Sequence, residues 1–202
     1  MKRWRIVAGI IVFATIAVFV PLIMLHDRHE RLVAAIDQMQ PESISKIKQL
    51  LAEGEDVKTR GHDNTVAMVA AFWNDAELLK QALDAGVDPN ATDAFGNTAL
   101  HFATIAPNIE LTKLLLAAGA NVNQQNGRGE TPLIGAVRNT QFELIKLLLA
   151  EGAKVDVASK SGETALSIAQ SLKPGGPRPM RPDLTSDDFV GRLNEATKSG
   201  ER

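Results

Sequence analysis

The chain of 202 residues contains no cysteine and no tyrosine, and only 4% of its residues are aromatic. Without cysteine it can form no disulfide, no thiolate metal site and no cysteine nucleophile. The shortage of aromatic rings leaves few platforms on which unpaired bases could stack. The absence of cysteine excludes enzymes with a cysteine nucleophile or a thiolate-bound metal. The shortage of aromatic rings argues against single-stranded nucleic acid as a partner.

Positive charge is scarce beyond the first five residues. Lys2, Arg3 and Arg5 supply three of the 22 basic side chains, so the rest of the chain carries 19 basic against 24 acidic ones. A nucleic-acid partner requires a basic face, and this balance argues against one.

Charge is missing altogether from residues 6–25, IVAGIIVFATIAVFVPLIML. Twenty helical residues rise about 30 Å, which is the thickness of the hydrocarbon core of a bilayer. The sequence therefore predicts a single transmembrane helix over 6–25. Because basic residues precede it, residues 1–5 are expected in the cytoplasm and the remainder on the periplasmic or other extracytoplasmic side of the inner (plasma) membrane. The alternative is a cleaved signal peptide, with Thr15 and Ala17 before the cut.

A repeat of 33 residues organises the rest of the chain. Threonine precedes an apolar run of helical spacing four times, at Thr65, Thr98, Thr131 and Thr164. Threonine is a good helix N-cap because its hydroxyl accepts a hydrogen bond from an amide of the first turn. A second apolar run follows and ends at a glycine, namely Gly86, Gly119 and Gly152. Glycine there suits a left-handed helix stop, so the predicted unit is turn, helix, loop, helix.

Neither helix of such a unit can bury its leucines alone, so the copies are expected to stack into an all-α solenoid. The second unit carries Asp93, Gly96, Thr98, Leu100, His101 and Ala103, then LLLAAGANVN at 114–123. The third unit carries Asn126, Gly129, Thr131, Pro132, Leu133 and Ala136. These units resemble the ankyrin repeat family. The first unit departs from it, with RGHDNT at 60–65 in place of the usual turn.

The repeats are expected to cover residues 59–172, between two caps that close the open ends of the core. Residues 27–58 are predicted to form a capping helix pair separated at Pro41. Residues 173–202 are predicted to hold a Pro/Gly-rich loop at 174–184 and a C-terminal capping helix.

No group of residues typical of catalysis or metal binding emerges from the sequence. Gly127 and Gly129 lack the third glycine of a dinucleotide site. His26 and His29 could share one helical face, but the sequence shows no carboxylate or thiolate of proven proximity to them. His101 with Thr98 resembles the structural hydrogen-bond pair of the family. We therefore expect no enzyme, no metal, no cofactor and no small-molecule substrate.

The resemblance implies that a partner protein binds the concave side, against hairpin tips and the exposed faces of the first helices. The tips are expected to supply His62, Asn64, Phe95, Asn97, Arg128, Glu130, Lys160 and Glu163. The first helices are expected to supply Phe72, Trp73, Ile105, Arg138 and Asn139. An alternative places Phe72 or Trp73 in the core beside the N-terminal cap.

Together these features predict a membrane-anchored, non-catalytic module that captures or scaffolds another protein. One hypothesis is an immunity protein that neutralises an exported toxin. The alternative is an accessory factor for a periplasmic enzyme, in oxidative stress or haem delivery.

Overall fold

The computed structural model describes residues 28–61, 64–105 and 108–171, together with Gly191. Within these ranges the regular elements are helices, and the remaining ladder-type pairing is one isolated bridge between Arg60 and Thr65. The predicted all-α class is confirmed for this part of the chain. The predicted membrane segment 6–25 and, apart from Gly191, the predicted C-terminal cap 173–202 lie outside it. Among the described residues, no helix is both long enough and apolar enough to cross a membrane.

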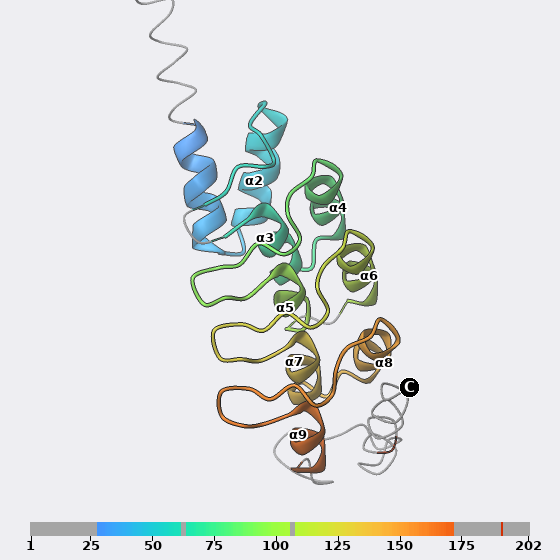
Figure 1. Ribbon diagram of the computed structural model, residues 1–202. Helices are drawn as coiled ribbons and strands as arrows, with labels where there is room; N and C mark the ends of the chain where they lie inside the picture. Colours follow the sequence, from blue (N-terminus) through green and yellow to red (C-terminus); the bar gives the residue numbers. More distant parts are fainter. Residues whose placement is uncertain (1–27, 62–63, 106–107, 172–190, 192–202) are drawn as a thin grey trace, which may run out of the picture.

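The helices stack in two columns, with long hairpin loops projecting on one side (Figure 1). The first helix of each unit lies in the central column: α3 (Val66–Phe72), α5 (Ala99–Ala103), α7 (Pro132–Arg138) and α9 (Ala165–Ser171). The second helices form the other column: α4 (Ala76–Asp84), α6 (Ile109–Ala117) and α8 (Phe142–Ala150). Each helix packs on its counterpart in the next unit, as α5 does on α3 and α8 does on α6.

A helix pair precedes the first unit. Residues 28–38 are helical, and α2 (Ser43–Ala52) follows after a turn that contains Pro41. Leu32 and Ile36 of the first helix, with Ile47 and Leu50 of α2, are fully buried and belong to the same core as the repeats. The pair therefore covers the core at the amino-terminal end of the stack.

The threonine N-caps predicted from the repeat are confirmed. The hydroxyl oxygen of Thr65 accepts from the Met68 amide at 3.3 Å, and that of Thr131 accepts from the Ile134 amide at 3.4 Å. Thr164 accepts in the same way from the Ser167 amide at 3.1 Å. These bonds satisfy donors that the first turn of a helix leaves without an internal partner.

The glycine stops are confirmed as well, since Gly86, Gly119 and Gly152 have φ angles of +87°, +87° and +84°. A side chain would strain this left-handed conformation, whereas glycine adopts it freely. Each glycine turns the chain away from the second helix and into the next hairpin.

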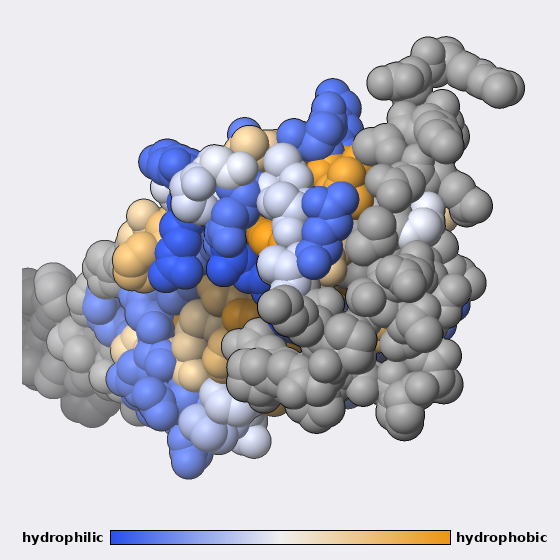
Figure 2. All heavy atoms as spheres, turned by 90° about the horizontal axis from the view of Figure 1, so that it is seen from below, coloured by the Kyte–Doolittle hydropathy of each residue, from blue (hydrophilic) through white to orange (hydrophobic). Residues whose placement is uncertain are grey.

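The core lies between the two columns and is built from the apolar positions of both helices. Leu78, Leu111 and Leu144 of the second helices, each 33 residues apart, are buried to within 1%. Seen from the end that carries α9, the described surface shows patches of hydrophobic atoms between hydrophilic ones (Figure 2).

Candidate functional site

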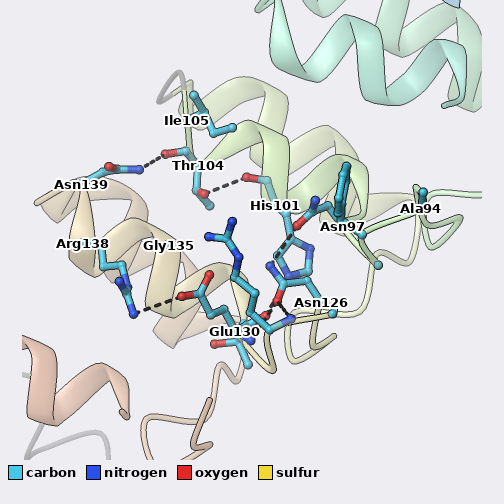
Figure 3. A pocket seen from close by; sticks show the side chains of 15 residues that line it. Ala94, Asn97, His101, Thr104, Ile105, Asn126, Glu130, Gly135, Arg138 and Asn139 are labelled. Carbon is cyan, nitrogen blue, oxygen red and sulfur yellow. Dashed lines mark hydrogen bonds and ion pairs between the residues drawn. The ribbon is translucent and has the colours of Figure 1, made fainter. Parts of the chain in front are cut away.

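A groove of about 730 Å³ lies between the hairpin tips of the second and third units and the helices α5 and α7 (Figure 3). More than half of the residues predicted to bind a partner line it: Phe95, Asn97, Ile105, Arg128, Glu130, Arg138 and Asn139. The repeat therefore brings together residues up to 44 positions apart in the sequence.

The tips of the groove are shaped by local hydrogen bonds from one side chain in each hairpin. Asp93 Oδ1 accepts from the amides of Phe95 at 2.9 Å and Asn97 at 2.7 Å. Asn126 Oδ1 does the same for Arg128 at 2.9 Å and Glu130 at 3.0 Å. Asp and Asn stabilise turns by bonding to backbone amides two or more residues ahead. Each tip is therefore ordered by its own sequence.

Consecutive tips are also joined through the backbone. The Gly127 amide donates to the Phe95 carbonyl at 2.7 Å, and the Lys160 amide donates to the Arg128 carbonyl at 2.8 Å. A Cβ atom added at Gly127 would lie 2.6 Å from the Phe95 carbonyl oxygen, so a larger residue would push the two tips apart. The tips consequently form one continuous edge of the groove.

His101 lines the groove from α5 and ties it to the next tip. Its Nδ1 accepts from the Thr98 amide at 3.1 Å, so the proton of the neutral ring is on Nε2, which donates to the Glu130 carbonyl at 3.0 Å. Burial lowers the pKa of His101, because it disfavours the charged imidazolium. Both ring nitrogens are thus engaged in holding helix and tip together, as the structural interpretation of this histidine predicts.

Arg138, at the end of α7, pairs with acidic residues of two tips. Its Nη2 lies 3.1 Å from Glu130 Oε1 and 2.6 Å from Glu163 Oε2 (Figure 3 shows the first of these). Arg138 and Glu163 are both partly exposed, so this network contributes little to stability by itself. Its consequence for recognition is that the charge of Arg138 is compensated within the chain.

The wall opposite the tips is formed where α5 meets α7. The Thr104 carbonyl accepts from Asn139 Nδ2 at 2.9 Å and from Gln141 Nε2 at 2.6 Å. A Cβ atom at Gly135 would lie 2.7 Å from Thr104 Oγ1, so glycine allows the two helices to approach. Ile105 follows directly and keeps 55% of its surface exposed.

The remaining predicted residues lie elsewhere. Phe72 and Trp73 are half-buried: Trp73 Nε1 donates to the Met39 carbonyl at 3.1 Å, and the two rings meet edge to face at 5.0 Å. Trp73 thus packs against the core beside the helix pair, as the alternative interpretation has it. Asn64 is only 8% exposed.

The fourth hairpin carries the last two predicted residues that the structure describes. Lys160 and Glu163 are exposed there, beside the groove. His62 lies outside the described residues.

The structure describes one of the two histidines next to the predicted membrane segment. His29 Nδ1 lies 3.7 Å from Glu55 Oε2, and His26 lies outside the described residues. Nowhere in residues 28–61, 64–105 and 108–171 do three or more potential ligands (His, Cys, Asp or Glu) gather in a way that could hold a metal ion.

Sequence reasoning missed two residues that shape the groove, Thr104 and Gly135. Gly135 had a signal, because it interrupts the apolar run PLIGAV, and a glycine inside a helix costs about 1 kcal/mol relative to alanine. Such a glycine indicates close approach of another element. Thr104 had none, since threonine at the end of a short helix is common.

The repeats match a known family model. The model for ankyrin repeats in three copies matches residues 32–126 and 106–174, which together make up more than half of the chain. Among curated proteins, no sequence matches the chain. The family match, the 33-residue period and the capped helix pairs agree, and the chain belongs to the ankyrin repeat family.

Proposed function

We propose that this protein captures another protein in the groove between its second and third hairpin tips, without catalysis. Ankyrin repeats are generally non-catalytic modules for protein–protein interaction. The observation that carries the proposal is the placement of Phe95 and Ile105, which are 76% and 55% exposed. They are the exposed large hydrophobic residues of the described chain, and both line the groove. Exposed apolar surface gathered at one place is typical of a binding site.

The rigidity of the groove supports the same function. Its tips are held by their own Asx turns and by backbone bonds to each other, and His101 fixes the third tip to α5. A surface ordered before binding loses little conformational entropy when a partner arrives. Aromatic and arginine side chains such as Phe95 and Arg128 are also the usual energetic anchors of interfaces.

The test is co-purification from native membranes with the double variant Phe95→Ser/Ile105→Ser. Both side chains are exposed, so the variant should keep the thermal unfolding midpoint of the wild type. The matched control is Lys113→Ser/Gln81→Ser, which changes two exposed residues on the second helices. We expect one protein to be retained by the wild type and the control and lost with the groove variant. Retention of the same proteins by all three would overturn the proposal.

We further propose that residues 6–25 anchor the chain in the membrane and that the repeats lie on its extracytoplasmic side. The support is the uncharged run itself and the basic residues that precede it. Alkaline extraction should leave the protein in the membrane fraction, and its intact mass should include residues 1–25. Release into the wash, or a mass lacking those residues, would contradict the anchor.

The identity of the retained protein would then separate the two physiological roles expected from the sequence. An exported toxin would indicate an immunity protein. A periplasmic enzyme would indicate an accessory factor.

A further inference from the structure

We propose that the partner inserts one large apolar side chain, carried on a short segment, over Gly135. This inference rests on the proposed function and names the side chain that the same groove receives. It is carried by a gap that Gly135 leaves in an otherwise apolar row along the first helices.

The row is one position that recurs every 33 residues and holds Val69, Phe102, Gly135 and Ile168. Val69 and Ile168 are buried, and Phe102 packs against the core. The ring of Phe102 reaches the preceding unit, where it meets the ring of Phe72 edge to face at 5.9 Å. The third unit contributes no side chain at this place, and Gly135 lines the groove instead.

The surroundings of Gly135 correspond to those of Phe102 one unit earlier. Ile105 is equivalent to Phe72, yet it is 55% exposed, whereas Phe72 is half-buried. The chain cannot easily fill the gap itself, because a Cβ atom at Gly135 would lie 2.7 Å from Thr104 Oγ1. A side chain that comes from a partner needs no Cβ on α7, and it can cover the exposed surface of Ile105.

The groups that border the gap favour an apolar side chain over a polar one. Phe95 and Ile105 are exposed and line the groove, and Ile105 and Gly135 come from the end of α5 and from α7 (Figure 3). Apolar residues at the centre of an interface pack against apolar residues of the partner. The Thr104 carbonyl already accepts two hydrogen bonds, and both ring nitrogens of His101 are engaged. A polar side chain would therefore find these groups occupied.

The charges around the groove give no preference for a partner of either sign. The second, third and fourth tips together with α7 carry three cationic and three anionic side chains, namely Arg128, Arg138 and Lys160 against Asp93, Glu130 and Glu163. His101 adds no charge at neutral pH, because burial lowers its pKa. Since these charges cancel, shape and apolar contact are left to select the partner.

The first step of the test is a selection of random peptides displayed on phage against the full-length protein in detergent micelles. We expect the selected sequences to share one position held by Leu, Ile, Met, Phe or Trp, without a common excess of acidic or basic residues. A synthetic consensus peptide, labelled with a fluorophore, then gives dissociation constants by anisotropy.

Two measurements on this peptide test the chemistry of the inserted side chain. Alanine at the shared apolar position should weaken binding roughly 10-fold or more, because the apolar surface buried in the groove is lost. The dissociation constant of the consensus peptide should change by less than about 2-fold between low and high ionic strength, because the charges around the groove cancel.

The second step fills the gap from within the chain. The variant Thr104→Ala/Gly135→Phe reproduces the pair formed by Ala71 and Phe102 one unit earlier, so the new ring has room beside the end of α5. It should occupy the place of the peptide's side chain and weaken binding roughly 10-fold or more. The matched control, Thr104→Ala/Gly135→Ala, removes the same hydroxyl but adds only a methyl group, and should keep the dissociation constant within about 3-fold. Thermal unfolding followed by circular dichroism checks that both variants are folded.

Four results would overturn the inference. They are failure to select any peptide, selected peptides that share charged residues but no large apolar one, and equal loss of binding with both Gly135 variants when both are folded. The fourth is a peptide lost with Phe95→Ser/Ile105→Ser but bound equally by the wild type and Thr104→Ala/Gly135→Phe. That result would preserve the proposed function and refute insertion over Gly135.

Discussion

The ends of α3, α5 and α7 put three equivalent residues to different uses. Phe72, Ile105 and Arg138 are each 33 residues apart, yet Phe72 is half-buried between aromatic rings, Ile105 is exposed and Arg138 is held by two carboxylates. The amino-terminal helix pair makes the difference for the first, because Trp73 beside it bonds to Met39. The repeat sets the position of a residue in the fold, and the residues around it determine whether it is buried, exposed or ion-paired.

The largest expected effect distinguishes the capped end from the groove. Trp73→Ala should lower the free energy of unfolding by about 3 kcal/mol, because it removes a packed ring and its bond to the Met39 carbonyl. Ile105→Ala should change it by less than about 0.5 kcal/mol, since this side chain is exposed. Urea unfolding of both variants measures the contrast. Equal effects would show that the capped end and the groove do not differ in packing.

A second substitution tests the close approach of α5 and α7. The positions equivalent to Gly135 in the other three units hold Val69, Phe102 and Ile168. Among the four units of the described chain, the third alone therefore has glycine there. Gly135→Ala should destabilise by about 1–2 kcal/mol, because the new Cβ would lie 2.7 Å from Thr104 Oγ1. Thermal unfolding gives the difference.

Removing the obstructing hydroxyl provides the control for Gly135. In the Thr104→Ala background, Gly135→Ala should lower the free energy of unfolding by less than it does in the wild type. If the higher helix propensity of alanine then dominates, the substitution should stabilise the protein. A cost that is unchanged in that background would mean that the clash with Thr104 is not its cause.

The third prediction concerns pH, and it separates His101 from the apolar residues at equivalent positions, Met68 and Ile134. Burial is the main cause that lowers the pKa of His101 in the folded chain, while the Glu130 carbonyl and the charges of Asp93 and Glu130 act in the opposite direction. The unfolded chain therefore binds the proton more readily. The stability linked to His101 should be complete above its usual pKa of 6.5 and decrease as the pH falls below it.

Urea unfolding at a series of pH values measures this dependence. His101→Ile introduces the residue found at the equivalent position of the third unit. Between pH 7 and pH 5.5 the free energy of unfolding of this variant should fall less than that of the wild type, whatever its absolute value. The same slope in both proteins would assign the pH dependence to other groups.

The smallest effect is expected in the loops between the two helices of a unit. Asn74 and Thr140 are equivalent, and both have left-handed backbones, with φ angles of +61° and +54°. Asparagine tolerates this conformation, whereas a β-branched residue is strained there. Thr140→Gly should therefore stabilise by about 0.5–1 kcal/mol, since the relief of strain exceeds the entropy that glycine adds to the unfolded chain. Asn74→Gly should stabilise the protein by less than Thr140→Gly does. Calorimetry that shows the reverse order would contradict the proposed strain at Thr140.

Much of the fold could be predicted from local chemistry. The threonines that cap the first helices and the glycines that end the second ones act within a few residues of themselves, so their spacing gives the helix bounds directly. Asp93 and Asn126 likewise order their own tips. The groove residues on those tips were predicted from the resemblance to the ankyrin repeat family.

The residues whose surroundings sequence reasoning left open or missed depend on neighbours far along the chain. Trp73 is half-buried against the core, and its Nε1 donates to the carbonyl of Met39, 34 residues earlier. Thr104 shapes the wall because Asn139 and Gln141, 35 and 37 residues later, bond to its carbonyl. No local sequence pattern predicts such partners.

By itself, the sequence determined the 33-residue unit, the ends of its helices and the residues that face the core, because these follow from backbone preferences and apolar spacing within one unit. Only the tertiary structure decided which equivalent positions stay exposed, which arginine is already compensated and where the groove opens. Those outcomes depend on contacts between units, because equivalent positions in different units have different neighbouring residues.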